Sequence, residues 1–246
     1  MAGIDLIMSI HIGDKLGSQF DKLVLKFYYY RYYLPFVFRT HIRYVKPRPM
    51  ETIINRQYEI FNDFIPHKND VVIDVGAYCG DYSIIWSKLY GAKVLAFEPS
   101  YFNYISARAN ITLNKANVDI VKFAIGNDDK TFSMYGNDMI NNFNFGEEQI
   151  GEMIRLDTIL YLYMYERVDL IKIDVEGFEL EVLVGAEKTL NDFKPKIILE
   201  THTSDLKRIA IRYLKNLGYE LKHIGREHTG SGAMDLVSEM YFESEK

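Results

Sequence analysis

The stretch "VVIDVGAYCGDYS", residues 71–83, joins an apolar strand to a glycine turn and to the first residues of a helix. Gly76 and Gly80 allow the backbone to turn sharply and to approach a ligand closely. The next apolar run ends in "FEPS", which places Glu98 22 residues after Gly76. A carboxylate at about that separation can accept hydrogen bonds from both hydroxyls of a ribose. We therefore expect a nucleoside site where two neighbouring strands end.

The spacing of the glycines narrows the kind of nucleoside. A dinucleotide fingerprint reads G-x-G-x-x-G, whereas this turn reads G-x-x-x-G, with Tyr78 where the second glycine would stand. The pyrophosphate turn is therefore absent, which favours a nucleoside without a diphosphate, such as S-adenosylmethionine. The alternative is a turn that merely connects strand to helix, with Glu98 as a surface acid. We favour the cofactor because both features fall at the ligand-facing ends of successive strands.

From about residue 51 onward, apolar runs typical of strands alternate with amphipathic stretches typical of helices. This alternation predicts an α/β fold with a mainly parallel sheet. Helices are expected over residues 81–90, after Ser100 and over residues 204–218, and the last two strands should form a hairpin. The strands are expected at residues 71–75, 93–97, 118–125, 168–174, 196–200, 218–225 and 234–243. Ligands of such sheets bind beyond the carboxyl ends of the strands, so the residues that end each strand matter most.

The stretch "IKIDVEGFE", residues 171–179, ends an apolar run with Asp174 and Glu176. An unpaired buried carboxylate is costly or loses its charge, so two acids at the end of a buried strand suggest a function. Both could face a cationic cofactor, and Lys172, on the same side of the strand, could neutralise one of them. The alternative is a structural network in which Lys172 pairs with Asp174 while Glu176 caps the helix that begins near Phe178.

Glu200 and His202 end the neighbouring strand, which brings them to the same edge of the sheet as Asp174 and Glu176. This position makes His202 a better candidate for a general base than the other five histidines. A reaction at a hydroxyl group of an acceptor would require removal of the hydroxyl proton, by a base or with the help of a metal. One imidazole among carboxylates suits the octahedral oxygen array of Mg²⁺ only loosely. We therefore predict metal-free catalysis, in which Asp174 orients the cofactor or acceptor and His202 or Glu176 takes the proton.

The composition is that of an ordinary globular enzyme. The 246 residues are 48% hydrophobic and 26% charged, carry a net charge of −5 and include a single cysteine, Cys79. The negative charge argues against a nucleic-acid partner, and one cysteine excludes an internal disulfide. The opening "MAGIDLIMSIHIGDKLG" lacks the basic start of a signal peptide, and no run reaches the roughly 20 apolar residues of a spanning helix. We expect a cytoplasmic protein.

Two segments stand outside this scheme. Residues 22–50 contain seven Lys or Arg, nine Tyr or Phe and no acid. They either form a helical cap over the cofactor or contact anionic headgroups, which would make the protein peripheral to the inner face of the membrane. We accordingly divide the chain into a basic aromatic extension, residues 1–50, and a catalytic domain, residues 51–246. The polar segment 135–152 is expected to be a long loop, either a substrate lid or disordered.

Several of these motifs together resemble the FkbM family of S-adenosylmethionine-dependent methyltransferases. The resemblance covers about residues 70–202 and rests on "VVIDVGAYCGDYS", "FEPS", "LDTIL", "PKIILETH" and, most distinctively, "KIDVEG" followed by an acid. It implies the class I, Rossmann-like methyltransferase fold, a seven-stranded and mainly parallel sheet with helices on both faces and a terminal antiparallel hairpin. It also implies O-methylation of a hydroxyl on a sugar, a glycan or glycolipid, or a secondary metabolite.

The resemblance further implies which residues hold the cofactor. The residues around the methionine side of the cofactor are Asp74, Gly76, Ala77 and Gly80, with Asp174 opposite the sulfonium. Glu98 and Pro99 lie at its ribose. Ala124 and Asn127 lie at its adenine. Ala124 fills a position at which class I enzymes often carry an acid or amide, which leaves Asn127 or backbone groups to meet the adenine amino group. Two alternatives stay open: an RNA methyltransferase, favoured only by the basic extension, and a non-catalytic module that binds an adenosine ligand.

Overall fold

The computed structural model describes residues 42–44, 61–135, 148–229 and 236–244. Its centre is a seven-stranded sheet in the order β3-β2-β1-β7-β8-β10-β9. The strands are β1 (Val71–Val75), β2 (Lys93–Phe97), β3 (Val118–Val121), β7 (Leu170–Ile173), β8 (Lys196–Thr201), β9 (Tyr219–Thr229) and β10 (Leu236–Ser244). Neighbours from β3 to β8 run parallel, and β10 is antiparallel to both β8 and β9. The predicted parallel sheet with a terminal hairpin is confirmed.

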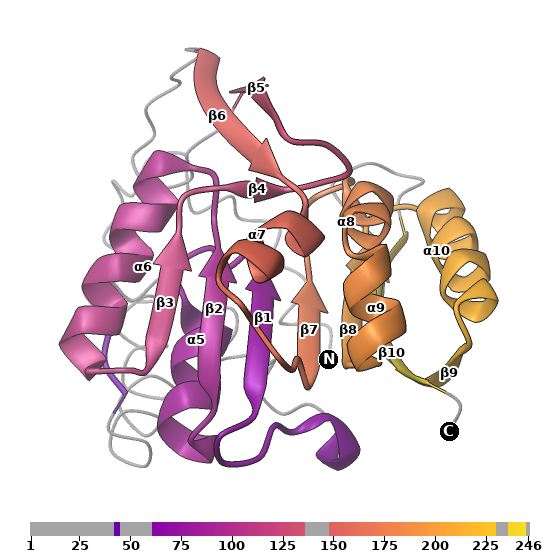
Figure 1. Ribbon diagram of the computed structural model, residues 1–246, viewed down its shortest axis with the longest axis horizontal. Coiled ribbons are helices and arrows are strands. Elements are labelled where there is room, and N and C mark those ends of the chain that lie inside the picture. The colour runs from indigo at the N-terminus through magenta and orange to yellow at the C-terminus, as the bar shows by residue number, and fades with distance from the viewer. Residues whose placement is uncertain (1–41, 45–60, 136–147, 230–235, 245–246) are drawn as a thin grey trace, which may run out of the picture.

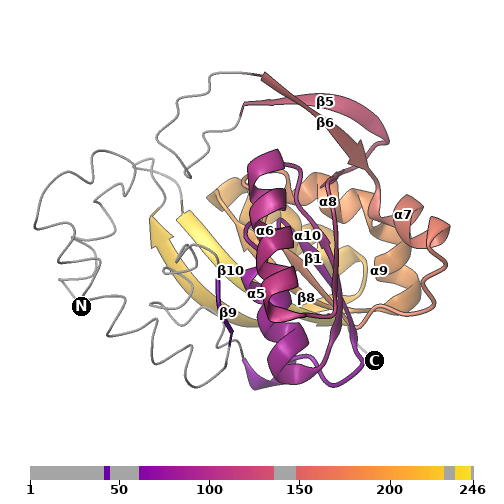
Figure 2. The same ribbon diagram turned by 90° about the vertical axis from the view of Figure 1, so that its left-hand side faces the viewer.

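Helices cover both faces of this sheet (Figures 1 and 2). They are η2 (Asn62–Phe64), α5 (Asp81–Ile85), η3 (Trp86–Tyr90), α6 (Tyr101–Asn114), α7 (Leu156–Leu162), α8 (Glu179–Gly185), α9 (Glu187–Phe193) and α10 (Ser204–Asn216). In Figure 1, α7 to α10 lie in front of the sheet and α5 lies behind it. Side chains of β1 alternate accordingly, with Val72 in the core on one face and Ile73 in the core on the other. Burial on both faces explains why these strands read as continuous apolar runs.

The predicted helices are confirmed, with small changes at their ends. The helix expected over residues 81–90 consists of α5 and the π-helical turn η3, and it ends at Gly91, whose φ of 76° is left-handed. α6 begins after Ser100 as predicted, but the Ser100 side chain makes no cap bond, and its N–H donates to Glu98 instead. α10 begins after Thr203, whose hydroxyl accepts a backbone N–H at 3.1 Å.

The strand expected over residues 118–125 is wrong in its second half. β3 ends at Val121, and the next paired residues form a separate three-stranded sheet in the order β4-β6-β5. β3 stops where its partner β2 ends: the N–H of Glu98 still donates to the Val121 carbonyl, but the next N–H on that side, of Ser100, donates to the Glu98 side chain instead. The strands of this second sheet are β4 (Ala124–Ile125), β5 (Lys130–Tyr135) and β6 (Glu148–Ile154).

The second sheet also corrects the expectation of a loop over residues 135–152. β6 begins at residue 148 and pairs antiparallel with β5, so residues 136–147 are the part that lies outside the described residues. The sequence of β6 concealed the strand because apolar and polar residues do not alternate along it: apolar Ile150 is 75% exposed, whereas Gly151 and Met153 are buried. Figure 1 shows the second sheet beyond the carboxyl ends of β1, β2 and β7. Its action as a substrate lid stays a prediction.

Three residues of the predicted extension, 42–44, are described, and they pack against α6. The N–H of Arg43 donates to Asn114 Oδ1 at 2.8 Å, and Asn114 Nδ2 donates to the Arg43 carbonyl at 2.6 Å. Ile42 and Tyr44 are buried in the same core as α5. The rest of residues 22–50, and with it the predicted membrane contact, lies outside the described residues. Within the described ranges, no helix combines the length and the apolar character needed to cross a bilayer.

Candidate active site

The glycine turn after β1 is held against two neighbouring strands. The N–H groups of Gly76 and Ala77 both donate to the carbonyl of Phe97 at the end of β2, at 3.0 and 2.9 Å. Gly76 has a φ of 83°, and a Cβ atom there would lie 1.8 Å from the carbonyl oxygen of Asp174. Glycine is required at this position because the backbone conformation and the neighbouring strand both exclude a side chain. The turn therefore brings the ends of β1, β2 and β7 together.

Glu98 lies beside this turn and is 6% exposed. Its Oε2 accepts from the N–H of Tyr78 at 2.9 Å, its Oε1 accepts from the N–H of Ser100 at 2.9 Å, and Asn103 Nδ2 lies 3.5 Å from Oε1. Burial raises the pKa of Glu98 to about 7 and outweighs these hydrogen bonds, which favour the charged form. Because a carboxylate offers about four acceptor positions, Glu98 retains capacity for donors from a ribose.

Asp74 is buried more deeply than Glu98, at 1% exposed. Its Oδ2 accepts from the hydroxyl of Ser83 on α5, and its Oδ1 lies 3.7 Å from Nζ of Lys172. That Oδ1 is buried and has no hydrogen-bond partner among the described residues. A buried acceptor without a donor is costly, so this oxygen is available to a donor from a ligand.

Lys172 links Asp74 on β1 to Asp174 beyond the end of β7. It lies opposite Asp74 in the register of the two strands, and its Nζ is 3.3 Å from Asp174 Oδ2. Burial alone would lower the pKa of Lys172, but the charges of Asp174 and Asp74 outweigh it and raise that pKa. The prediction that Lys172 lies on the same side as Asp174 and neutralises an acid there is confirmed.

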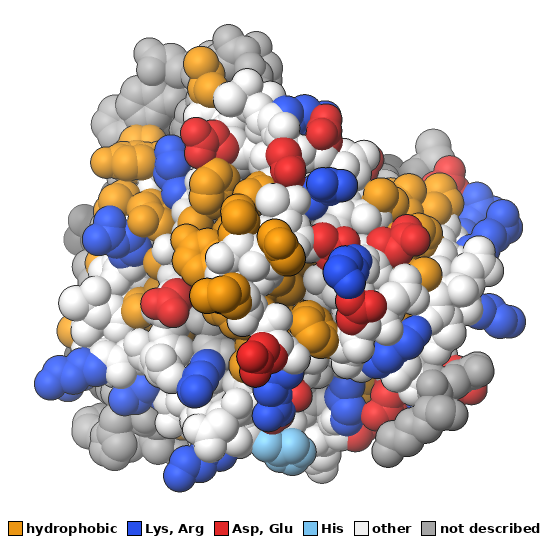
Figure 3. All heavy atoms as spheres, viewed as in Figure 1, with side chains coloured by type: hydrophobic (Ala, Val, Ile, Leu, Met, Phe, Trp, Pro, Cys, Tyr) orange, Lys and Arg blue, Asp and Glu red, His pale blue; other side chains and the backbone are white. Residues whose placement is uncertain are grey.

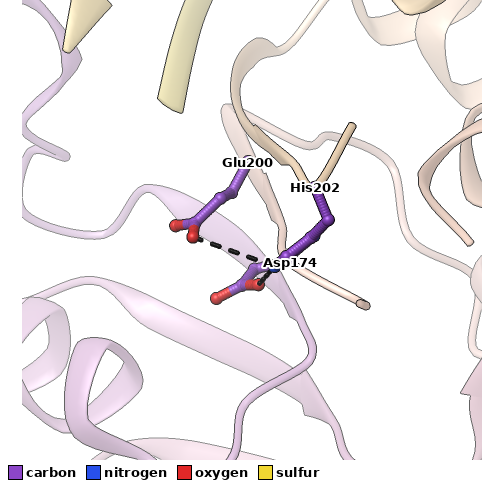
Figure 4. A group of neighbouring side chains, drawn as sticks. All are labelled: Asp174, Glu200 and His202. Carbon is purple, nitrogen blue, oxygen red and sulfur yellow. Dashed lines mark ion pairs between the residues drawn. The ribbon is translucent and has the colours of Figure 1, made fainter. Parts of the chain in front are cut away.

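His202 follows β8 and lies close to Asp174 and Glu200 (Figure 4). Its Nδ1 is 2.8 Å from Oε1 of Glu179, whose side chain is fully buried. Its Nε2 is 3.3 Å from Glu176 Oε2, 3.8 Å from Asp174 Oδ1 and 3.9 Å from Glu200 Oε1. The structure therefore brings together the four residues that the sequence nominated for catalysis, Asp174, Glu176, Glu200 and His202.

The charges around His202 set its protonation. Burial alone would lower the pKa of His202, but the hydrogen bond to Glu179 and the charges of the neighbouring acids raise it to about 9. Burial and the charge of Asp174 raise the pKa of Glu200 well above its ordinary value. Without a further cation, these shifts favour the protonated forms of the imidazole and of Glu200.

Glu176, in the loop after β7, does not act as the helix cap that the alternative reading of the sequence expected. Glu176 has a φ of 55°, and its side chain is 85% exposed and reaches His202. The N–H of Gly177 donates to Glu179 Oε1 at 2.9 Å, at the start of α8. Glu179 is the residue at this site that sequence reasoning missed. Its one signal was its place as the acid that follows "KIDVEG".

The spacing of three donors would admit a cation. Asp174, Glu200 and His202 each offer one ligand atom, and these atoms lie within 4.8 Å of one another. A metal ion or the positive charge of a ligand would fit such a group. Catalysis without a metal stays a prediction.

Ala124 and Asn127 do not end a strand of the main sheet, because β3 stops at Val121. Ala124 belongs to β4 in the second sheet, and Asn127 lies in the exposed turn that follows. Their assignment to the adenine stays a prediction. Gly80, by contrast, lies at the start of α5 with a left-handed φ of 78°, and Pro99 follows Glu98 directly beyond β2.

Sequence comparison agrees with this geometry. The profile described as the Methyltransferase FkbM domain matches residues 74–221, a range that includes the glycine turn, Glu98 and the whole group around His202. The chain belongs to the FkbM methyltransferase family. It is therefore a methyltransferase that uses S-adenosylmethionine.

This FkbM methyltransferase is also similar to individual proteins. Methyltransferase sdnD from Sordaria araneosa is 27% identical over 190 residues, which are 61% of this chain and 72% of the relative. The structure of methyltransferase FkbM from Methylobacillus flagellatus is 17% identical, with a TM-score of 0.48, and the match covers 78% of this chain and 52% of that one. Trm5b from Pyrococcus abyssi is 18% identical with a TM-score of 0.50, over 83% and 51% of the two chains. This chain thus spans about half the length of these two structures, and the likeness to them concerns the fold.

The site of this FkbM methyltransferase fits S-adenosylmethionine in three respects. Asp74 Oδ1 is a buried acceptor that could receive a hydrogen bond from the cofactor's amino group. Glu98 has acceptor capacity for a ribose beside the glycine turn. Around His202, carboxylates outnumber the cations Lys172 and His202, so an added sulfonium would be stabilised there.

Proposed function

We propose that this FkbM methyltransferase is an O-methyltransferase that acts on a hydroxyl group of a sugar, a glycan or glycolipid, or another small metabolite. The observation that supports it is the imidazole of His202, whose Nε2 lies 3.3–3.9 Å from three carboxylates beside the glycine turn. An alcohol must lose its proton as it accepts a methyl group, and histidine is the commonest side chain that removes such a proton.

In the proposed mechanism, the chain's own residues bind, orient and deprotonate. The residues that would hold the cofactor are Asp74, Gly76, Ala77, Gly80, Glu98 and Pro99, with Asp174 beside its sulfonium. S-adenosylmethionine, when bound, supplies a methyl group that is already activated by the positive charge on sulfur. The pKa of His202, about 9 without the cofactor, would be lower beside that positive charge, because like charges disfavour the imidazolium.

His202 then takes the hydroxyl proton through Nε2, while Asp174 orients the acceptor. Glu176 is the alternative base, because its Oε2 reaches the same space from the exposed side of the loop. Glu200, whose pKa is raised by burial and by Asp174, can donate a hydrogen bond to a second oxygen of a polyhydroxylated acceptor when it is protonated.

The charges of the site favour a neutral acceptor over a nucleic acid. The carboxylates around His202 would repel a phosphate backbone at the point of reaction. On the face drawn in Figure 3, Lys and Arg side chains are scattered among acids and are not gathered into a stripe. Solved structures with this fold include RNA methyltransferases, so the fold alone leaves the acceptor open.

We place the catalytic domain at residues 51–246, preceded by the basic aromatic extension of residues 1–50. The family match at residues 74–221 lies within this domain. A lipid-linked sugar would be a natural acceptor if the extension contacts anionic lipid. Flotation with anionic liposomes tests that contact, and the absence of salt-sensitive binding would remove it.

Transfer of a labelled methyl group tests the proposed function. Purified protein is incubated with methyl-labelled S-adenosylmethionine and with separate fractions of glycans, glycolipids, small metabolites and RNA. We expect an alkali-stable methyl ether in a carbohydrate or metabolite fraction, and no label with His202→Ala. Label in RNA alone would favour the RNA methyltransferase, and cofactor binding without any transfer would favour the non-catalytic module.

A further inference from the structure

Glu179 is a fully buried acid at the start of α8, at 0% exposed. One of its oxygens, Oε1, accepts from the N–H of Gly177 at 2.9 Å and lies 2.8 Å from Nδ1 of His202. The other, Oε2, has no hydrogen-bond partner among the described residues. A buried carboxylate with one unsatisfied oxygen destabilises the fold. The reason for having Glu179 at this position must therefore lie in the contacts of Oε1.

We propose that Glu179 is a positioning residue that fixes the ring orientation and the tautomer of His202, so that Nε2 presents its lone pair to the acceptor hydroxyl. This proposal rests on the proposed function, in which His202 is the base. An ionised carboxylate has no proton to donate, so Nδ1 must be the donor in the contact with Glu179. In the neutral imidazole, the lone pair then lies on Nε2.

The surroundings of His202 agree with this assignment. Its Nε2 faces Asp174 and Glu176 from the loop after β7 and Glu200 from β8, at 3.3–3.9 Å. These carboxylates can receive a proton or face a cation at Nε2, whereas Glu179 contacts the other ring nitrogen, Nδ1. Lys172, the nearby cation on β7, is paired with Asp174 and Asp74.

Two substitutions separate the hydrogen bond from the charge of Glu179. In Glu179→Gln the amide oxygen must take the place of Oε1, because the Gly177 N–H and the Nδ1–H both point at that one atom. The tautomer of His202 is therefore retained and the negative charge is lost. Glu179→Ala removes the acceptor as well, so the proton of the neutral ring is free to move to Nε2.

Nitrogen-15 NMR of labelled histidine reads both effects without any acceptor. At about pH 10, above the pKa of His202, we expect Nδ1–H in the wild type and in Glu179→Gln, and a shift toward Nε2–H in Glu179→Ala. Glu179→Gln should also lower the titration midpoint of His202, because the nearest negative charge is gone. Tyr219→Phe is the control, because it removes a buried hydrogen bond of 3.1 Å from the Tyr219 hydroxyl to the Leu190 carbonyl. It should change neither the tautomer nor the titration midpoint of His202.

Turnover supplies the second readout. We expect Glu179→Ala to lower kcat about 100-fold, the scale of a misdirected general base, with KM and cofactor affinity little changed, and Glu179→Gln to lose less. An unchanged tautomer in Glu179→Ala overturns the proposal. If that variant does not fold, an unchanged titration midpoint in Glu179→Gln overturns it. A shifted tautomer together with full turnover of His202→Ala would support the orientation by Glu179 and overturn the proposed base.

Discussion

The candidate active site has two parts, one around Glu98 and one around His202, and they differ in which groups stabilise the charges of their acids. At the end of β2, both oxygens of Glu98 accept backbone N–H groups, from Tyr78 and Ser100. Around His202, by contrast, the acids approach the same imidazole at 2.8–3.9 Å, and Lys172 pairs with Asp174 alone among them. The protein completes the first site by itself and leaves the second with excess negative charge.

This difference suggests which half binds and which half reacts. A carboxylate held by backbone donors is fixed before a ligand arrives, which suits recognition of a ribose. Around His202, the pKa values of Glu176, Glu200 and the imidazole are raised, so these groups hold protons that they can exchange, and the acids there gain stability from an incoming cation. Substitutions at the first site should therefore weaken binding, and substitutions at the second should slow turnover.

The largest expected effect is on turnover. His202→Ala and Asp174→Asn should each lower kcat about 100- to 10,000-fold, the range that a positioned base contributes, while the fold and cofactor binding persist. Steady-state kinetics on the labelled acceptor and calorimetry with the cofactor measure the two quantities. Full turnover in both variants would erase the distinction between the two sites.

The second effect concerns the turn that joins the two regions. Gly76 and Gly80 both have left-handed φ values, of 83° and 78°, so alanine at either position costs about 1–2 kcal/mol of strain. At Gly76 the new Cβ would also lie 1.8 Å from the backbone oxygen of Asp174, whereas at Gly80 the nearest atom is at 3.5 Å. Urea unfolding should therefore show a loss of about 3 kcal/mol or more for Gly76→Ala and a smaller loss for Gly80→Ala. Equal losses would mean that the close approach of Gly76 to the Asp174 carbonyl does not constrain the turn.

The third effect is on cofactor affinity. Glu98→Ala should weaken binding of S-adenosylmethionine by about 1.5–3 kcal/mol, the range for hydrogen bonds to a charged group, and should leave kcat at saturation nearly unchanged. Calorimetry decides this, with NAD as the ligand that should not bind. Binding of NAD without binding of S-adenosylmethionine would contradict the assignment of Glu98.

The affinity should also depend on pH through Glu98. Its pKa in the folded protein is raised to about 7, and donors from a ribose favour the charged form, so binding releases a proton. Affinity should therefore rise with pH until the carboxyl is ionised above that pKa, and fall below it. The same titration on Glu98→Gln is the control, because that variant keeps an acceptor and loses the ionisation.

The smallest expected effect is that of metal removal. Protein treated with EDTA should keep its turnover if His202 acts as the base without a metal. Activity that EDTA abolishes and Mg²⁺ restores would instead show that Asp174, Glu200 and His202 share a cation, in agreement with the 4.8 Å span of their ligand atoms. That result would make the group around His202 a metal site.

The main sheet and most of the proposed site could be predicted because their signals are local. Apolar runs, glycine turns and the residues that end each strand lie together in the sequence, and the parity of a strand placed Lys172 beside Asp174. The second sheet was missed because apolar and polar residues do not alternate along β6, where Ile150 is exposed, and because β4 looked like a continuation of β3. β3 ends where its partner β2 ends, because the N–H of Ser100 donates to Glu98, and residues 118–125 alone do not contain that partner.

The sequence by itself determined the α/β fold, the cofactor class and the edge of the sheet at which the reactive residues gather. The tertiary structure decided which carboxylate holds which nitrogen of His202. Glu179 and His202 are 23 positions apart in the chain, with α8, α9 and β8 between them. That separation closes to 2.8 Å only because β7 and β8 pair in register and α8 begins directly over their ends. Strand pairing is a long-range contact, and no spacing within the sequence specifies it.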